Sequence, residues 1–574
     1  MSSAVIGAKK KSPQSGHGGG VRGDSLDRRS SSFEGRFGRM FRSLPPAMWD
    51  KQVLLNLGDA MTSDPETDPK DPNLPSAAFE DLGKRIHDDE ENAGIPAGYT
   101  YLGQFIDHDI TFDPASSLMQ QNDPDALVDF RTPRLDLDSL YGRGPGDQPY
   151  MYTTDGRKFR LGRALTENGK SSPARDLPRF DDPANGAKRA LIGDKRNDEN
   201  VIVSQLHSAM LQLHNRFADE DSQAPFESIQ QKVRRYYQWV VVNDFLVKIC
   251  GDEVIHDILP HLGAGKPIWK NLPHFAFYKP HEDPFMPVEF STAAYRFGHS
   301  MVRPIYRLNT HLAGGDNPGQ ATPAEEKRGV AGRFFIFAGV QKRGLNGFDE
   351  FPSQWAIDWS LFFDIKGSIA KVGKERVQPA YKIDTSLVNP LGFLPEFSKD
   401  PAPPNPPMTI TQLQSVPKDP KGDPSNLADR NLLRGMSMGL PSGQSVALAM
   451  GVQPIDDDNL RIGKAVVADW PNNKPLAKFD PSFSKNAPLW FYVLAEAQYE
   501  WIQRAKAKGS QGDEEPLKLG TVGARIVAET LIGLLWGDGH SYLRQAPNWM
   551  PEHGIRNMGD LIDFALTGVS AKHS

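Results

Sequence analysis

Residues 101–113 set a histidine, carboxylates and an amide among apolar side chains, and no other stretch constrains the chain as strongly. If the stretch is helical, Gln104, Asp107 and His108 lie at positions i, i+3 and i+4 and share one face. A surface helix has little reason to gather these groups, whereas in an active site His108 can act as a base while Gln104 holds a small polar ligand. The simpler alternative is a buried histidine whose hydrogen bonds are satisfied.

A second polar segment, Arg131–Gly142, alternates oxygen-bearing and apolar residues. The side chains of Thr132, Asp136 and Asp138, with the backbone carbonyl of Arg134, can converge on one side of an extended strip. Calcium takes six to eight oxygen ligands of these kinds. Taken alone, the segment also fits a polar turn with solvated aspartates.

Residues 193–200 read Gly-Asp-Lys-Arg-Asn-Asp-Glu-Asn and precede a run whose apolar residues are spaced by three and four, as in an amphipathic helix. We expect Asn197 or Asp198 to cap that helix. Arg196 would then lie at the N-terminus of this helix and Glu199 in its first turn. The alternative is a capping carboxylate beside a surface arginine.

Small residues in the segment Ser291–Arg307 surround His299 and allow a flat group to approach closely. Arg296 precedes His299 by three residues, so we expect both on the same face of a helix. Farther along, Asn431 and Arg434 are again three residues apart. Each of these four residues, taken alone, fits an ordinary buried polar group.

In this order, across residues 101–441, the five segments resemble the motifs of the animal-type haem peroxidases, the group that includes myeloperoxidase, lactoperoxidase and peroxidasin. The resemblance implies that His108 is the catalytic base, with Gln104 beside it. It also implies that Arg196 stabilises negative charge while the O–O bond of peroxide breaks. His299 matches the proximal iron ligand of a haem b.

The resemblance assigns further residues to the haem. Asp107 and Glu199 match the carboxylates that form ester bonds to it. Arg296 and Arg434 match partners of its propionates. Asn431 matches the residue that accepts the second N–H of the proximal histidine, a bond that makes the ligand more electron-donating.

A calcium site next to the catalytic histidine is also implied. Asp109, which follows that histidine directly, joins Thr132, Arg134 (through its carbonyl), Asp136 and Asp138 as ligands. The family usually has serine where this chain has Asp138, so the expected site carries one more negative charge.

Two departures from the animal members lead us to expect a bacterial relative. Asn200 stands where myeloperoxidase has a methionine that bonds a haem vinyl group, and Gly-Met-Ser-Met follows Arg434 in place of a more polar continuation. The single cysteine, Cys250, excludes an intrachain disulfide. The fold must therefore depend on core burial and on its bound groups.

Charge and hydropathy exclude some classes of function. The net charge of −6 argues against nucleic acid as a partner. No run of eighteen apolar residues is present, so we expect no transmembrane helix. No apolar stretch follows the lysines at 9–11, which leaves no visible signal peptide. We expect a soluble protein, either cytoplasmic or exported by a non-classical route, and the sequence sets no oligomeric state.

Helical patterns at 226–249, 490–507 and 519–535, with few and short strand signals, predict a mainly α fold. We expect residues 1–43 to form a disordered, basic, Ser/Gly-rich tail and residues 44–574 to form one large peroxidase domain. The proline-rich stretch 401–407 is expected to be a long connection within that domain.

The expected reaction is the reduction of hydrogen peroxide with oxidation of a halide, thiocyanate or a small aromatic donor. One alternative is a fatty-acid dioxygenase of the same superfamily, which has a radical-forming tyrosine three residues before the proximal histidine. Here that position is Arg296, and Tyr295, about 100° away on a helix, should point away from the haem. A non-catalytic, calcium-stabilised interaction protein is the other alternative, although the polar residues of the expected site are all present.

Overall fold

The computed structural model describes most of the chain after residue 36. The described residues are 37–65, 67–68, 71–75, 88–112, 131–167, 170–181, 183, 186, 188–264, 267–279, 284–312, 332–337, 344–394, 424–509 and 514–571. Residues 1–36 of the expected tail and the proline-rich stretch 401–407 lie outside them.

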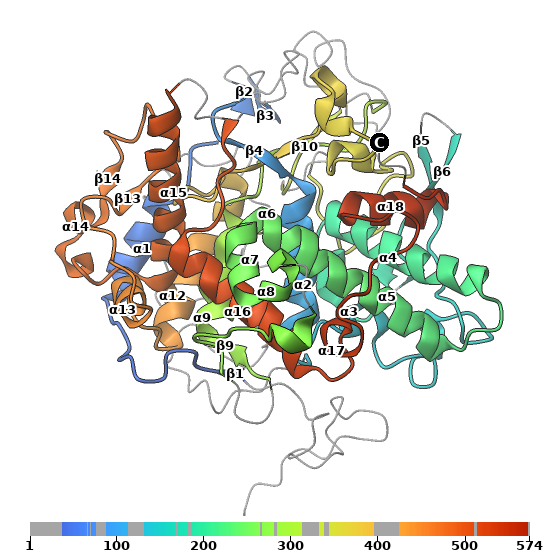
Figure 1. Ribbon diagram of the computed structural model, residues 1–574. Helices are drawn as coiled ribbons and strands as arrows, with labels where there is room; N and C mark the ends of the chain where they lie inside the picture. The colour runs from blue at the N-terminus through green and yellow to red at the C-terminus, as the bar shows by residue number, and fades with distance from the viewer. Residues whose placement is uncertain are drawn as a thin grey trace, which may run out of the picture.

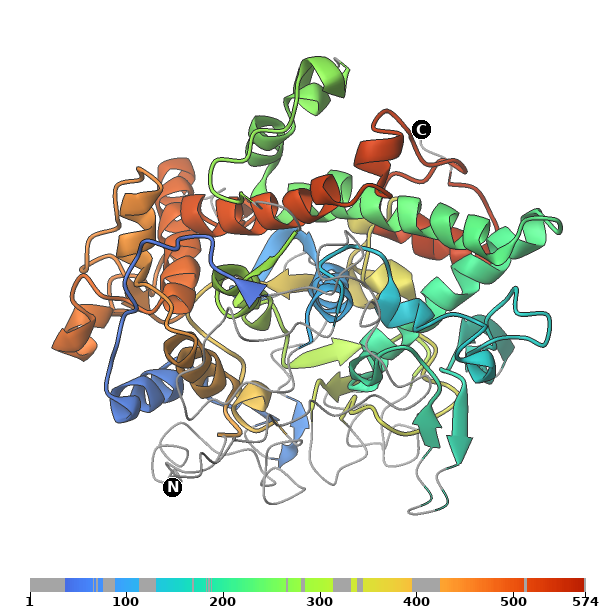
Figure 2. The ribbon, with the colours of Figure 1, turned by 90° about the horizontal axis from the view of Figure 1, so that it is seen from below.

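Helices are the main regular structure of the described residues, and they surround helix α2 (Gly98–Ile110), drawn in blue near the centre of both views (Figures 1 and 2). The helices expected from the apolar spacing are present. The other α-helices are α1 (Lys51–Ala60), α3 (Asp138–Tyr141), α4 (Val201–Glu220), α5 (Phe226–Val240), α6 (Leu246–Cys250), α7 (Asp252–Ile258), α8 (Pro260–Ala264), α9 (Val288–Ser291), α12 (Leu427–Ser437), α13 (Gly443–Ala449), α14 (Leu476–Phe479), α15 (Leu489–Lys508), α16 (Thr521–Gly537), α17 (Tyr542–Gln545) and α18 (Met558–Thr567).

Tighter or wider turns connect these helices. The π-helical turn η5 (Val241–Phe245) joins α5 to α6. The 3₁₀ turns are η3 (Pro149–Met151), η4 (Lys195–Asp198), η6 (Ile268–Lys270), η7 (Ala294–His299), η8 (Trp359–Leu361), η9 (Ser368–Ala370), η10 (Gly373–Glu375), η11 (Asn389–Gly392) and η13 (Pro481–Phe483).

Strands are short, and those in the described ranges pair only two at a time. The pairs are β1 (Phe37–Gly38) with β9 (Met286–Pro287), β2 (Thr67–Asp68) with β3 (Asp71–Pro75), β4 (Glu91–Pro96) with β12 (Pro379–Tyr381), β5 (Ala164–Glu167) with β6 (Lys170–Arg175), β7 (Arg179–Asp181) with β8 (Lys188–Ala190), β10 (Ile305–Arg307) with β11 (Arg333–Phe335), and β13 (Arg461–Ile462) with β14 (Lys474–Pro475). The mainly α fold predicted from the sequence is confirmed.

The end of the expected tail is part of the packed structure. Strand β1 pairs in parallel with β9, and the side chains of Phe37 and Phe41 are buried. The backbone N–H groups of Met40 and Phe41 donate to the buried carboxylate of Glu289. The boundary expected at residue 43 is therefore wrong for residues 37–43, because two aromatic side chains and a buried carboxylate hold them.

Helix α2 lies in the core of the fold, and its apolar residues are completely buried. Leu102, Phe105 and Ile106 have no exposed surface, and burying a large apolar side chain contributes roughly 1.5–3 kcal/mol. The helix contacts α4 on one side and η7 on another. Its polar face is thereby fixed between the two segments that the sequence marks as functional.

A buried ion-pair network ties the approach to α2 to the segment that follows η7. The side chain of Glu91, at the start of β4, has no exposed surface and accepts from Arg303 at 2.8 Å and from Arg376 at 2.7 Å. Arg303 lies four residues after His299 and also donates to the carbonyl of Pro379 in β12. Removing one member would leave a buried charge unpaired, which typically costs 3–5 kcal/mol.

Candidate active site

A cavity of about 660 Å³ lies between α2 and η7. Helix α2 contributes Gln104, Asp107 and His108 to its wall, and η7 contributes Arg296 and His299. The three polar residues predicted to share one helix face therefore open into the same space. Cavities of this size are typical of sites for small molecules and cofactors.

His108 is a buried, neutral imidazole in the wall of this cavity. Its Nδ1 lies 2.8 Å from Oδ1 of Asn197. Burial and the nearby charge of Arg196 lower the pKa of His108 to about 4. At neutral pH the ring is therefore uncharged and able to accept a proton.

Arg196 comes from η4 and lies against the carboxyl end of α2. Its Nη2 donates to the carbonyls of His108, at 3.0 Å, and Thr111, at 2.7 Å. The same nitrogen pairs with the carboxylate of Asp194 at 2.7 Å, and the guanidinium stacks on Phe112 at 4.8 Å from the ring centre. These contacts fix a positive charge beside His108 at the cavity wall.

The cap of α4 is Asn200, not Asn197 or Asp198 as expected. Its Oδ1 accepts from the N–H groups of Ile202, at 3.1 Å, and Val203, at 2.9 Å. The reason is that the 3₁₀ turn η4 precedes the α-helix, which begins only at Val201. Glu199 therefore lies before the helix and not in its first turn.

Asn200 also connects α4 to the polar face of α2. Its Nδ2 donates to Oε1 of Gln104 at 3.3 Å, and Nε2 of Gln104 donates to the carboxylate of Glu199. All three residues line the cavity. Asn200 thus holds Gln104 in position.

His299 is the last residue of a 3₁₀ turn, whereas we expected it on an α-helix. The non-helical backbone of Ala293, with φ −135° and ψ −78°, precedes the turn. Side chains three residues apart eclipse in a 3₁₀ helix, so Arg296 and His299 still share a face. Burial and the charge of Arg296 lower the pKa of His299 to about 3, which leaves a neutral imidazole.

Asn431, in α12, lies beside His299, with Nδ2 at 2.8 Å from Nδ1 of the histidine. In this arrangement the ring proton belongs on Nε2. Binding iron through Nε2 requires the proton on Nδ1 and therefore the amide of Asn431 turned by half a turn, so that its oxygen accepts.

The two expected ester carboxylates, Asp107 and Glu199, both line the cavity. Asp107 lies 3.9 Å from Nη1 of Arg296. Burial opposes its ionisation, but the charges of Arg296, His108 and Arg196 hold the pKa of Asp107 below its usual value. Asp107 is therefore ionised at neutral pH.

The wall of the cavity includes Arg430 of α12, a residue that the sequence analysis missed. The predicted propionate partner Arg434 lies one turn farther along α12 and is not among the residues of the wall. The i, i+4 spacing of two arginines on one helix was the available signal.

Tyr295 lies in the cavity wall, although it was expected to point away from it. The ring is held in stacking contact with Phe290, 4.5 Å between centres. Its hydroxyl donates to the carbonyl of Gly103 at 3.2 Å. The hydroxyl is thus engaged by the backbone of α2.

The expected calcium loop brings three buried carboxylates together. Asp109, Asp136 and Asp138 offer oxygens that all lie within 4.8 Å of one another. Thr132 donates to Asp136 at 3.0 Å, and the left-handed Leu137 turns its N–H toward Asp109 at 3.1 Å. Burial and the charges of Asp138 and Asp136 raise the pKa of Asp109 well above its usual value. Such a cluster fits a divalent cation with oxygen ligands.

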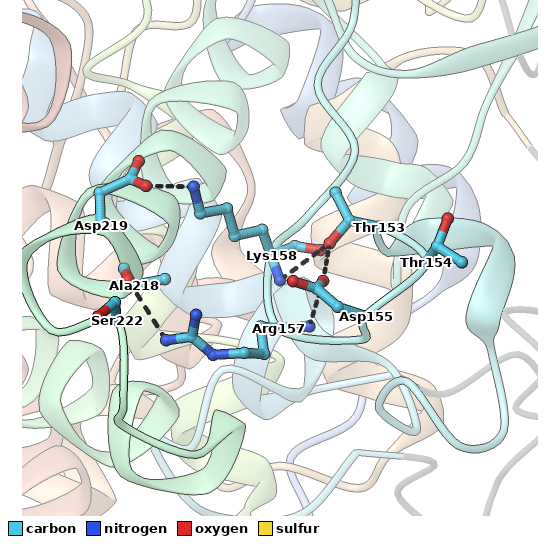
Figure 3. A pocket seen from close by; sticks show the side chains of 8 residues that line it. All are labelled: Thr153, Thr154, Asp155, Arg157, Lys158, Ala218, Asp219 and Ser222. Carbon is cyan, nitrogen blue, oxygen red and sulfur yellow. Dashed lines mark hydrogen bonds and ion pairs between the residues drawn. The ribbon is translucent and has the colours of Figure 1, made fainter.

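An open hollow elsewhere on the surface has basic side chains with a structural role (Figure 3). Arg157 donates to the carbonyls of Ala218, at 3.3 Å, and Asp221, at 2.9 Å, at the end of α4. Lys158 pairs with Asp219. These contacts fasten the loop of residues 153–158 to α4, and the hollow adds nothing to the site around His108.

The residues of the cavity fit a haem. Two neutral histidines reach it from separate elements, and Gly298 has open space where a Cβ would stand. Arg296 and Arg430 supply positive charge for propionates, and apolar side chains cover other parts of the wall, among them Met301, Val302, Ile336, Phe337, Leu391 and Leu394.

Comparisons with known proteins agree with this reading. The model of the family described as animal haem peroxidase matches residues 117–327. Thyroid peroxidase of Sus scrofa is 26% identical over 191 residues, which are 30% of this chain and 19% of that protein. Heme peroxidase 2 of Caenorhabditis elegans is 26% identical over 289 residues, 40% of this chain and 39% of that protein. The chain thus matches about a fifth of the length of the first relative and two fifths of the second.

Among solved structures, peroxidase A from Dictyostelium discoideum covers 96% of this chain and 97% of its own, with a TM-score of 0.54 at 14% identity. The fold is therefore the helical fold of haem peroxidases. The relationship indicated by the motifs is confirmed: this chain is a relative of the animal haem peroxidases. Within the described ranges, the structure contains no helix with the length and apolar character needed to cross a membrane.

Proposed function

We propose that this protein is a haem peroxidase that reduces hydrogen peroxide and oxidises a small donor. The observation that carries the proposal is one cavity with His108 and His299 in its wall and Arg196 fixed beside His108. A haem b held by His299 would supply the redox chemistry. Asn431 would orient His299, and Arg296 and Arg430 would pair with the propionates.

The protein's own residues would carry the proton transfers. His108, which is neutral, takes a proton from one peroxide oxygen and returns it to the departing oxygen. Arg196 stabilises the negative charge that develops as the O–O bond breaks. Gln104, held by Asn200, keeps the peroxide beside His108.

An absorption spectrum of the purified protein, recorded before and after one equivalent of hydrogen peroxide, tests this proposal. We expect a Soret band that shifts with peroxide and returns when a donor is added. Iodide, thiocyanate, bromide and a simple phenol at equal concentration should act as donors, and chloride poorly, because Asn200 cannot form the sulfonium bond of myeloperoxidase. The proposal would be contradicted if the protein bound no haem, or if peroxide did not change its Soret band.

The place of Tyr295 in the cavity wall keeps a fatty-acid dioxygenase as the second candidate. Its hydroxyl already donates to Gly103, so we expect no oxygen uptake when the haem-loaded protein is mixed with palmitate. Uptake that is lost in Tyr295→Phe would favour the dioxygenase.

We also propose that the carboxylates of Asp109, Asp136 and Asp138 bind one calcium ion. A ligand at about 100 times its Kd adds roughly 2.7 kcal/mol to stability. Chelation with EGTA should therefore lower the melting temperature and the activity, and Asp136→Asn should lower both and abolish the response to EGTA. The matched control is Asp155→Asn, at an exposed aspartate. Metal analysis without calcium and a melting temperature unaffected by EGTA would refute this site.

A covalent bond between Glu199 and the haem is a further expectation, since its carboxylate lies in the cavity wall. After several turnovers with peroxide, acid–acetone extraction should leave haem on the wild-type protein. Glu199→Gln should release more haem, whereas the exposed Glu220→Gln should behave as wild type. Complete extraction of haem from the turned-over wild type would rule out any ester.

A further inference from the structure

Three buried side chains form a hydrogen-bonded chain that begins at His108 and extends away from the cavity. Nδ1 of His108 lies 2.8 Å from Oδ1 of Asn197, and Nδ2 of Asn197 lies 3.0 Å from Nδ1 of His207. Asn197 and His207 have no exposed surface, and His108 is 5% exposed. The three residues come from different elements, namely α2, η4 and α4.

The chemistry of the amide fixes where the protons lie. A carboxamide oxygen only accepts hydrogen bonds, so Nδ1 of His108 must carry the proton and its Nε2 keeps a lone pair. A carboxamide nitrogen only donates, so Nδ1 of His207 must be the acceptor. The orientation of the Asn197 amide therefore decides which nitrogen of His108 can take a proton.

His207 gives the amide that orientation. Its ring is packed edge-to-face against Phe105, 6.0 Å between centres, and among the described residues no partner reaches its Nε2. Burying an imidazole that makes only one hydrogen bond costs free energy, and an apolar side chain in the same place would not have this cost. The bond to Asn197 is the contact that an apolar residue could not make.

We propose that Asn197, oriented by His207, is a positioning residue that holds His108 in the tautomer with an unprotonated Nε2. This inference rests on the proposed function, in which that nitrogen receives the proton of peroxide. With the amide reversed, Nε2 would carry a proton and His108 would be a donor that cannot begin the reaction.

Two variants of Asn197 separate orientation from bulk. Asn197→Leu keeps a similar volume and removes the acceptor, while Asn197→Asp keeps an oxygen that accepts from Nδ1 of His108. The readouts are the rate of cyanide binding to the ferric haem, which needs a distal base to take the proton of HCN, and the rate of the Soret change with peroxide. We expect both rates to fall on the order of 100-fold in Asn197→Leu and to stay within a few-fold of wild type in Asn197→Asp.

Asn215→Leu is the matched control. Asn215 is also an asparagine with both amide atoms bonded, but to the backbone of Phe159 at 2.7 and 2.9 Å. Its replacement should lower the melting temperature without changing either rate. A decrease in the rates that merely follows the loss of stability would appear in this control too.

His207→Phe tests the outer end of the chain and replaces Asn197→Leu if that variant does not fold. The amide of Asn197 then loses its orienting acceptor, so we expect an intermediate decrease of both rates with the Soret band unchanged. Wild-type rates in Asn197→Leu or, where it does not fold, in His207→Phe would overturn the inference while leaving the peroxidase proposal intact. A wild-type protein that binds no haem or ignores peroxide would instead overturn the proposed function.

Discussion

Replacing His299 with glycine is expected to abolish the Soret band of the ferric protein or convert it to that of a weakly ligated haem. The side chain lines the cavity from η7, and Asn431 of α12 is 2.8 Å behind it. In the proposed function this imidazole would hold the iron, so losing His299 should have a larger effect than losing any propionate partner.

Imidazole added to the His299→Gly protein should restore the band, because the vacated space and the amide of Asn431 can hold a free ring. His274→Ala, at an exposed histidine outside the cavity, should bind haem as the wild type does. Circular dichroism of the haem-free variants checks that the fold is kept. A Soret band unchanged in His299→Gly without imidazole would mean that another residue binds the iron.

Replacing His108 with leucine should slow the reaction with peroxide by about 10²–10⁴-fold while leaving the Soret band in place. The reason is that this neutral imidazole is the proton acceptor in the proposed function, and leucine has a similar volume and no lone pair. The second-order rate constant, measured by stopped flow, should fall for every donor, since the affected step precedes donor oxidation.

The affinity for the donor should change little in this variant, which distinguishes loss of the base from a distorted cavity. Arg196→Lys offers a comparison, because it keeps the charge beside His108 and loses the bonds of Nη2 to the carbonyls of His108 and Thr111. A His108→Leu protein that reacts with peroxide at the wild-type rate would place the base elsewhere.

Local patterns in the sequence were sufficient for the parts of the site that repeat with helical spacing. Gln104, Asp107 and His108 line one cavity because their spacing of three and four residues places them on one face of α2. The alternation of residue types also found Asp136 and Asp138, although they meet Asp109 across a turn at the left-handed Leu137 and not along an extended strip. On α2, backbone geometry over a few residues decides the direction of the side chains.

Contacts between segments far apart in the sequence could not be read in this way. The cap of α4 was placed too early because asparagine and aspartate at 197, 198 and 200 are all good caps, and only the 3₁₀ turn η4 decides among them. Tyr295 lines the cavity while its ring stacks on Phe290 and its hydroxyl donates to the carbonyl of Gly103 in α2, and these contacts between separate elements carry no signal in the local sequence.

The sequence by itself indicated the relationship to the animal haem peroxidases, the mainly α fold and the residue types around the cavity, because these depend on composition, apolar spacing and short motifs. Only the tertiary structure decided that Asn197 bridges His108 and His207, that Glu91 binds Arg303 and Arg376, and that Arg430 lines the cavity. Those pairings join elements separated by ten to nearly three hundred residues. Which polar groups meet there is set by the packing of whole helices, which must leave each buried donor and charge with a partner.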